Sequence, residues 1–418
     1  MPLIYSIIAP LIIISSVAVY QGEAFTAIET ARLLQNCMLI AGIGTLLQLY
    51  PIWKIGSGLP VVMGISFTFL AACLATASQD YGIMVGAIIV GGCFEGVLGL
   101  TAKYWRKIIS PIVSACVVVS IGLSILNVGV SSFGSSSAYP LGSWQNLLVA
   151  TITLAAALIF HTTLKGVAKQ LYVLLGMVVG YAVSICFGIV DFAAMGDTIR
   201  ELGVIAVPQL FAFRPQFQPG AILSFCLVFI ISAVETIGDT TACCKGGLAR
   251  DIMADEISGS LCVDGFASAL SGGVFGCSPI TSFSQNVGLI SMTHVVNRFT
   301  IMFGALAMIL GGLFPPTAAF FTTLPDCVLG GCKVMMLGSI MMSGVRMMHD
   351  AGMDQRNTLI AATSICLGVG VTQADGFFNE LPSFIGDIFA GNMVAGVFVV
   401  GLILDLCLPR DPSHYTSM

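Results

Sequence analysis

Two acidic side chains, Glu235 and Asp239, lie four residues apart in the apolar stretch SAVETIGDTT. Residues at this spacing share one face of a helix. Two carboxylates so close together at low dielectric oppose each other's ionisation, which favours a proton on one of them. Such a carboxyl could carry the proton of a coupled transport step, and an ionised Glu235 could accept hydrogen bonds from the N–H groups of a ligand. For Asp239 the alternative is a structural role at a helix end, where it would hold neighbouring backbone.

Two further carboxylates, Glu95 and Asp264, lie in apolar stretches of their own. A carboxylate costs about 2.5 kcal/mol or more at the centre of a bilayer, so each needs a partner, a cavity or a proton. We assign Glu95 a structural role and interpret Asp264 as a hydrogen-bond acceptor that positions helices. An intramembrane enzyme is an alternative from another class, but it would need a nucleophile with an oriented base or clustered metal ligands. The histidines and cysteines form neither pattern, so we predict no catalytic residues, no metal and no cofactor.

Amide and aromatic side chains follow two motifs that contain proline and would interrupt a helix, one around Pro60 and one around Pro279. Gln285 and Asn286 come shortly after Pro279, and their amides can both donate and accept hydrogen bonds. A planar ring that bears carbonyl and N–H groups requires such partners. Phe67 offers a ring face for stacking and a backbone N–H, and Ser66 directly precedes it. We therefore take these four residues, with Glu235, as candidates for substrate binding.

The composition places these residues inside a membrane protein. The chain has 418 residues, of which 57% are hydrophobic and only 9% are charged, where soluble domains carry about 25%. The mean hydropathy is +0.98. These values, with apolar runs recurring from end to end, indicate an all-α polytopic membrane protein. The net charge of −5 comes without a basic stripe, which excludes nucleic-acid binding by phosphate neutralisation.

Fourteen apolar segments are interpreted as membrane spans. They cover residues 2–19, 33–50, 59–78, 82–101, 109–130, 146–163, 171–190, 220–241, 259–275, 277–292, 299–314, 327–345, 358–372 and 391–408. With both termini in the cytoplasm, the basic residues on the inner side outnumber those outside by four to one, which satisfies the positive-inside rule. The first segment lacks a basic n-region and a cleavage site, so no cleavable signal is predicted. We expect the protein in the cell membrane.

Helix breakers recur at equivalent positions in the two halves of the chain. Gly58-Leu59-Pro60 interrupts span three, and Ser278-Pro279 interrupts span ten, 219 residues after Pro60. Seven spans in each half would give two repeats of opposite orientation, and paired breaks in such repeats are the best pointer to a substrate site. Irregular backbone at membrane depth needs cover from protein or a water-filled cavity. The alternative is that both breaks are ordinary kinks.

Two motifs resemble those of the nucleobase–ascorbate transporters, also called nucleobase:cation symporter family 2. They are ETIGDTT from Glu235 and SQNVGLISMT from Ser284. The resemblance extends over nearly the whole chain. It implies fourteen spans in two inverted seven-segment repeats, with short strands in broken spans three and ten. It further implies a core domain from residues 1–108 and 220–314, and a gate domain from residues 109–219 and 315–418, with substrate bound between them.

The same resemblance implies the roles of individual residues. Glu235 and Gln285 would bind the base through their side chains, while Phe67 would add backbone and ring contacts. Asp239, Asp264 and Asn286 would organise the site and couple protons. The core would move against a dimerised gate in an elevator-like cycle. The coupling ion would be a proton, with sodium as the alternative, and the protein would be a homodimer.

The amide at Gln285 indicates the substrate, because uracil-type members of the family carry a carboxylate there and xanthine or urate transporters carry Gln. We therefore expect an oxidised purine, xanthine or uric acid. Val287 and His294 depart from the usual pattern, so the choice between these two bases stays open. The alternatives are a permease for uracil or another nucleobase, and an anion transporter of the same architecture, although intramembrane carboxylates around a cavity oppose an inorganic anion.

Overall fold

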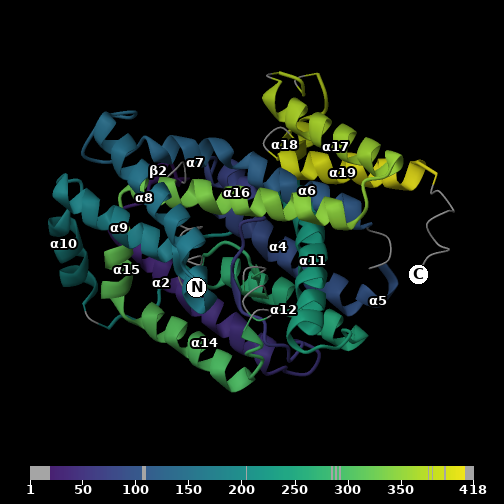
Figure 1. Cartoon of the computed structure of the whole chain (residues 1–418), viewed down its shortest axis with the longest axis horizontal. Helices are drawn as coiled ribbons and strands as arrows, with labels where there is room; N and C mark the ends of the chain where they lie inside the picture. Colours follow the sequence, from purple (N-terminus) through teal and green to yellow (C-terminus); the bar gives the residue numbers. More distant parts are fainter. Residues whose placement is uncertain are drawn as a thin grey trace.

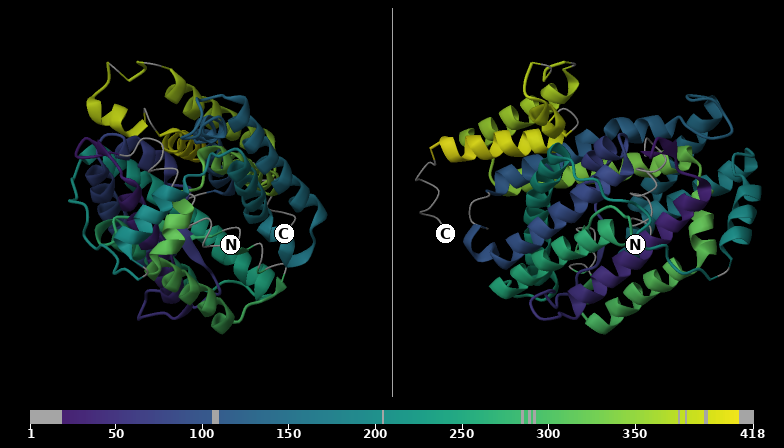
Figure 2. Two further views of the ribbon diagram at one scale, coloured as in Figure 1. Left: turned by 90° about the vertical axis from the view of Figure 1, so that its left-hand side faces the viewer. Right: turned by 180° about the vertical axis from the view of Figure 1, so that it is seen from behind.

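The computed structural model describes residues 19–105, 110–203, 205–283, 286–287, 290, 293–374, 376–378, 380–389 and 392–409. These residues form a mostly helical protein, in which two groups of helices pack against each other (Figures 1 and 2). The predicted all-α architecture with several apolar spans is therefore confirmed.

The first group contains helices from the beginning and the middle of the chain. They are α2 (Ala27–Leu49), α3 (Leu70–Ala77), α4 (Tyr81–Leu100), α11 (Pro219–Gly247), α12 (Ala254–Gly273) and α14 (Arg298–Leu313). α4 packs on α12 and α11, and α2 packs on α14 and α12. Segments about 200 residues apart thus lie side by side. The short helices α5 (Ala102–Trp105) and α15 (Pro315–Thr322) adjoin this group.

The second group has its own helix pairings. It contains α6 (Pro111–Ser124), α7 (Leu126–Phe133), α8 (Trp144–Thr163), α9 (Tyr172–Cys186), α16 (Asp326–Asp350), α17 (Gln355–Gln373) and α19 (Met393–Cys407). α16 packs on α6, α7 and α8, while α17 pairs with α19. α17 and α19 form the yellow layer at the upper right of Figure 1, beside α18 (Ser383–Phe389). An ion pair of 2.8 Å between Arg356 and Asp405 ties α17 to α19.

Two short strands connect the interrupted spans at the centre of the first group. β3 (Met63–Ile65) pairs antiparallel with β4 (Ile280–Ser282), and Gly64 lies opposite Thr281. Gly58 and Gly276 precede these strands with φ of +69° and +65°, a region that favours glycine. All six strand residues are buried. The short strands predicted in broken spans three and ten are therefore present, and each strand satisfies the other's backbone groups away from water.

Side chains of the surrounding helices hold the two strands in place. The Thr45 hydroxyl on α2 accepts a hydrogen bond of 3.0 Å from the Met63 N–H. The Ser268 hydroxyl on α12 accepts from the Ile280 N–H at 3.1 Å and donates to the Ile280 carbonyl at 2.8 Å. The strand pair is thus fixed to both neighbouring helices, which makes it a rigid platform.

The packing of α4 on α12 depends on small residues. A Cβ atom at Gly92 would lie 2.6 Å from the Ala269 backbone nitrogen and 2.7 Å from the Gly265 carbonyl oxygen. Real Cβ atoms do not approach backbone so closely, so only glycine fits. Close approach through small residues is the usual way in which membrane helices associate. It brings Glu95 of α4 next to α12 and α11.

The structure contains elements that the sequence did not predict. A hairpin of β1 (Val19–Tyr20) and β2 (Glu23–Ala24) precedes α2, and the polar helix α10 (Phe192–Leu202) follows α9, with η1 (Gly166–Leu171) between α8 and α9. α14 and α15 meet at an angle of 79°. Six of the described helices are long and apolar enough to cross a membrane, or seven if this bent pair counts as one. The count of fourteen spans in inverted repeats therefore stays a prediction.

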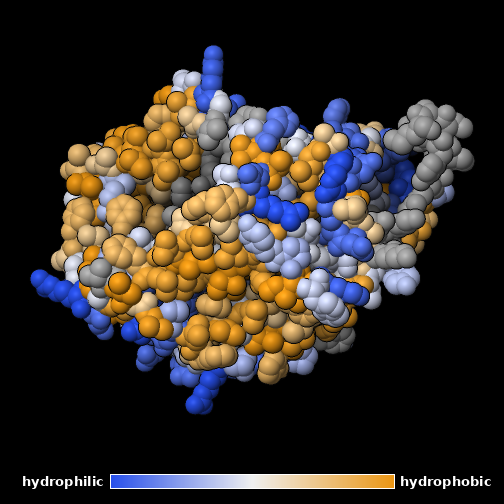
Figure 3. All heavy atoms as spheres, turned by 90° about the horizontal axis from the view of Figure 1, so that it is seen from below, coloured by the Kyte–Doolittle hydropathy of each residue, from blue (hydrophilic) through white to orange (hydrophobic). Residues whose placement is uncertain are grey.

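The outer surface of the protein is apolar. Figure 3 shows one face as a broad hydrophobic area, with hydrophilic residues mostly at its margins. Large side chains such as Leu310 and Val130 are more than half exposed. A continuous apolar surface of this kind is suited to lipid rather than to water. With the long apolar helices, it identifies a multi-pass integral membrane protein.

Candidate functional site

A cavity of about 190 Å³ lies where the two helix groups meet. One wall comes from the first group, with the residues after β3, the strand β4 and Glu235 of α11. The opposite wall comes from α6 and α16 of the second group. The lining residues are Ser66, Phe67, Thr68, Val118, Ile121, Glu235, Thr281, Ser282, Phe283, Ser339, Ile340 and Ser343. The cavity thus combines an acidic group, several hydroxyls and aromatic rings.

Glu235 is the ionisable group of this cavity, and a hydrogen bond fixes its position. The Thr68 hydroxyl donates to Glu235 Oε2 at 2.6 Å. Ser66 in turn accepts a hydrogen bond of 3.3 Å from the Thr68 N–H, which stabilises the turn between β3 and α3. Glu235 is half-buried, so its carboxylate can meet a ligand without losing all contact with water. The two interrupted segments and the acidic side chain therefore converge on one space.

Behind the cavity, two hydroxyls connect two carboxyls. The Thr236 hydroxyl donates to Asp264 and lies 3.2 Å from the Ser282 hydroxyl. The Ser282 hydroxyl donates to Asp239 at 3.1 Å. Asp264 is fully buried and Asp239 nearly so. This series of hydrogen bonds joins α11, α12 and β4. A change in protonation at either carboxyl would therefore alter the hydrogen bonds of β4, which lines the cavity.

A second cavity, of about 250 Å³, adjoins the first. It shares Val118, Ile121, Glu235 and Ser343 with the first cavity. Its other lining residues are mainly apolar and come from α6, α11, α16 and α19, with Asp239 among them. Glu235 thus stands at the boundary between the two spaces.

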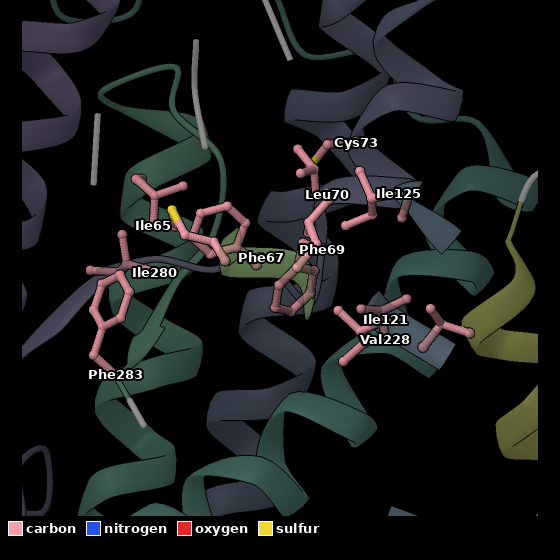
Figure 4. Close-up of a cluster of buried hydrophobic side chains, with 14 of the residues drawn as sticks. Ile65, Phe67, Phe69, Leu70, Cys73, Ile121, Ile125, Val228, Ile280 and Phe283 are labelled. Carbon is pink, nitrogen blue, oxygen red and sulfur yellow. The ribbon is translucent and has the colours of Figure 1, made fainter. Parts of the chain in front are cut away.

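Apolar side chains surround the polar groups of the first cavity. Phe67 is 7% exposed, so its ring is packed on most sides and presents only a small part to the cavity. Figure 4 shows it in the buried cluster that includes Ile65 and Ile280 from the two strands and Phe283 directly after β4. Such walls lower the local dielectric and strengthen polar contacts to a ligand.

The structure brings together most, but not all, of the residues predicted from the sequence. Ser66, Phe67 and Glu235 line the first cavity, and Asp239 lines the second. Asp264 lies behind them and contacts Thr236. Asn286 follows β4, but it is not among the described residues that line either cavity. Gln285 lies outside the described residues, so its prediction stays untested.

Several lining residues were missed by the sequence analysis. Thr68, Thr281 and Ser282 belong to the segments next to the helix breaks, so their position was a usable signal. Ser339 and Ser343 lie four residues apart on α16, which places them on one helix face. They lie in a methionine-rich stretch whose composition indicates helix packing or lipid contact. Only the tertiary fold places this face opposite Glu235.

This fold and this cavity define a membrane transport protein. A model of the Permease family matches residues 4–376, and the chain belongs to that family. The resemblance to the nucleobase–ascorbate transporters is thereby confirmed. Members of this family are permeases rather than enzymes.

Relatives and solved structures agree with this assignment. The xanthine permease XanQ of Escherichia coli is 32% identical over 402 residues, which cover 92% of this chain and 85% of its own. The xanthine permease of Bacillus subtilis is also 32% identical over 402 residues, which cover 94% and 88%. The transmembrane domain of the cyanobacterial bicarbonate transporter BicA superposes with a TM-score of 0.55 at 12% identity, covering 97% and 96% of the two chains. That last likeness shows the fold alone.

Proposed function

We propose that this protein is a proton-coupled symporter that takes up an oxidised purine nucleobase, xanthine or uric acid. The observation that carries the proposal is the placement of Glu235 in a cavity that β4 and the residues directly after β3 also line. The names of the relatives with 32% identity, which are xanthine permeases, support the substrate class.

The cavity offers what an oxidised purine needs. The Glu235 carboxylate could accept hydrogen bonds from ring N–H groups, and hydroxyls such as Thr281 and Ser343 could donate to ring carbonyls. The exposed part of the Phe67 ring could contact the face of the base. From the sequence, the Gln285 amide would add a partner that both donates and accepts. A bare inorganic anion would meet the carboxylate instead, which argues against an anion carrier.

The position of the cavity supports an elevator-type cycle. Its walls belong to different helix groups. We propose that the first group belongs to a core domain (residues 1–108 and 220–314) and the second to a gate domain (residues 109–219 and 315–418). Movement of the first group against the second would carry Glu235 and the strand pair across the membrane with the substrate. We further propose a homodimer in the cell membrane with cytoplasmic termini, and a proton rather than sodium as the coupling ion.

Uptake measurements test the substrate and the role of Glu235 together. Cells that express the protein are given labelled xanthine, uric acid and uracil at two pH values, with and without a protonophore. We expect uptake of an oxidised purine that is faster at the lower external pH. The Glu235→Gln variant should lose uptake while still inserting in the membrane, because the amide keeps the size but removes the anionic acceptor.

An exposed position provides the matched control. Glu201→Gln on α10 makes the same chemical change away from both cavities and should leave uptake unchanged. Normal transport by Glu235→Gln with unchanged pH dependence would refute the role of Glu235. Competition of uptake by sulfate, but not by purines, would favour the anion carrier.

A further inference from the structure

A fully buried carboxyl, Glu95, lies on α4 outside both cavities. Its side chain is 0% exposed, and within the described residues neither carboxyl oxygen has a hydrogen-bond partner. The Ser232 hydroxyl on α11 lies beside it, but without the geometry of a hydrogen bond. An ionised carboxylate in this place would lose its hydration without compensation. The neutral, protonated acid is therefore the form of Glu95 that fits this conformation.

The charged groups that face Glu95 are themselves acidic. They are Asp264 on α12 and Glu235 on α11. Among the other elements packed on α4, α3 has the sequence LAACLATA and β1 is Val-Tyr, so neither carries a charge that could compensate Glu95. α5 follows the end of α4 nearer to Glu95 and has the sequence AKYW, which contains Lys103. A neighbouring negative charge makes ionisation of Glu95 still less favourable. Glu95 can thus release its proton only when its surroundings change.

The hydrogen-bonded chain of side chains next to Glu95 lacks one hydrogen when both of its carboxyls are ionised. Asp264, Thr236, Ser282 and Asp239 are joined by three oxygen–oxygen contacts. The two hydroxyls supply only two hydrogens, which are directed at the two carboxyls. If both carboxyls are ionised, the 3.2 Å contact between Thr236 and Ser282 has no hydrogen. One added proton on either carboxyl completes all three contacts, so the chain is built to accept a single proton.

We propose that Glu95 is the inner end of a proton-carrying chain that runs through Asp264, Thr236 and Ser282 to Asp239, and that the coupling proton rests on Glu95 in this conformation. The inference rests on the proposed function and adds to it the residue that stores the proton. The sequence indicated only a structural role for Glu95, because the lack of hydrogen-bond partners depends on tertiary packing.

Release of the Glu95 proton to water proceeds by a series of proton transfers along this chain of side chains. When the surroundings of Glu95 change so that its carboxyl meets Asp264, the O–H bond of Glu95 breaks and its proton joins the Asp264 carboxylate. Asp264 then passes a proton to the Thr236 hydroxyl, Thr236 passes its own to Ser282, and Ser282 passes its own to Asp239. Asp239 lines the second cavity and passes this proton to water there. One proton moves from Glu95 to water, and loading follows the same steps in reverse.

The test uses the full-length chain in proteoliposomes with labelled xanthine. Two quantities are measured: accumulation driven by an imposed pH gradient, and counterflow exchange without a gradient. A pH-sensitive dye inside the vesicles reports proton entry. The variants are Glu95→Gln, which fixes the neutral form, Glu95→Asp, which keeps a titratable acid, and Glu201→Gln on α10 as the exposed control.

Glu95→Gln should keep counterflow within about twofold of the wild type but lose about tenfold in gradient-driven accumulation, the range of a typical coupling between two bound ligands. Its proton entry should fall with accumulation, and its pH profile should flatten. Glu95→Asp should retain pH-dependent accumulation, and Glu201→Gln should behave like the wild type. A purely structural role would instead change exchange and accumulation equally in both Glu95 variants.

Two results would overturn the proposal. One is a Glu95→Gln protein with the pH profile and proton entry of the wild type. The other is a well-folded Glu95→Asp protein that has lost coupling as completely as Glu95→Gln, since the titratable group would then be irrelevant. A wild-type protein that moves xanthine without protons, or does not move it at all, contradicts the proposed function itself.

Discussion

Thr68 positions the carboxylate on which substrate binding is proposed to depend. Its hydroxyl donates to Glu235 at 2.6 Å, and both side chains line the same cavity. Hydrogen bonds to charged groups contribute about 1.5–3 kcal/mol. Thr68→Val keeps the shape of the side chain and removes the donor, so we expect the KM for xanthine uptake to rise about tenfold or more. Kinetics of uptake in cells measure this change.

Thr68→Ser is the control for that experiment, because it keeps the hydroxyl and should bind nearly as well as the wild type. An unchanged KM in Thr68→Val would show that Glu235 does not need this hydrogen bond to meet its ligand.

At the start of α12, Arg250 and Glu256 form an ion pair at 2.5 Å, before the predicted ninth span. The hydrogen bond from Arg250 lowers the pKa of Glu256 below its usual value of 4.5. The stability it gives is therefore present above pH 4.5 and is lost as the pH falls through the lowered pKa. The Arg250 side chain is 40% exposed, so solvent limits the contribution to about 1 kcal/mol or less.

Thermal denaturation in detergent at several pH values checks this contribution. Glu256→Gln should melt below the wild type at pH 7, and the gap should close in acid, where the wild-type carboxyl is also neutral. A gap of constant size from pH 7 to pH 4 would assign the effect to packing instead.

The sequence predicted the acidic residues of the site better than their connections. Glu235 and Asp239 stood out because a carboxylate in an apolar run is costly. The hydroxyls of Thr236 on α11 and Ser282 in β4 join Asp239 to Asp264. Serine and threonine are common in membrane proteins, where their hydroxyls usually bond to nearby backbone. Which hydroxyl turns toward a carboxyl depends on tertiary packing, and this the sequence could not give.

Among the secondary-structure elements, the pair of α4 and α12 carries a strict steric requirement. A Cβ at Gly92 would meet backbone atoms of α12 at 2.6 Å and 2.7 Å, and backbone cannot move aside as a side chain can. Gly92→Ala should therefore lower the melting temperature in detergent, as overpacking costs about 1–3 kcal/mol. The loss should occur even though alanine favours a helix by about 1 kcal/mol over glycine.

Gly304 on α14 provides the comparison, since a Cβ there would meet nothing within 4 Å. Gly304→Ala should leave the melting temperature equal to the wild type or raise it. Equal behaviour of the two variants would show that α4 and α12 are not in close contact in the membrane.

The sequence best predicted the elements that begin after helix-breaking residues. Glycine and proline before Met63 and Ile280 marked the breaks, and the structure pairs the strands that follow. The hairpin of Val19–Tyr20 with Glu23–Ala24 is too short to leave a pattern of alternating residues. α10 is amphipathic and short, and its sequence FAAMGDTIREL carries three charged residues, so it does not form an apolar span. Helix bends such as that between α14 and α15 depend on packing rather than on composition.

At the scale of the whole molecule, the two helix groups together line two adjoining cavities. Ser343 on α16 lines both cavities, as does Glu235 on the opposite wall. The side chain of Ser343 faces open space, so a larger residue can enter without disturbing the core. Because transport is proposed to require movement of one group past the other, a large side chain here should block both binding and movement.

Ser343→Trp should therefore abolish xanthine uptake and the rise in melting temperature that xanthine gives the wild type, while the protein still folds and inserts. Ser343→Ala should transport normally. Met342→Trp adds the same bulk one residue earlier, at an exposed position outside both cavities, and should have little effect. If Ser343→Trp still takes up xanthine at the wild-type rate, the substrate does not pass between α11 and α16. If Met342→Trp is equally inactive, bulk on α16 disturbs the protein regardless of direction, and the cavity does not account for the block.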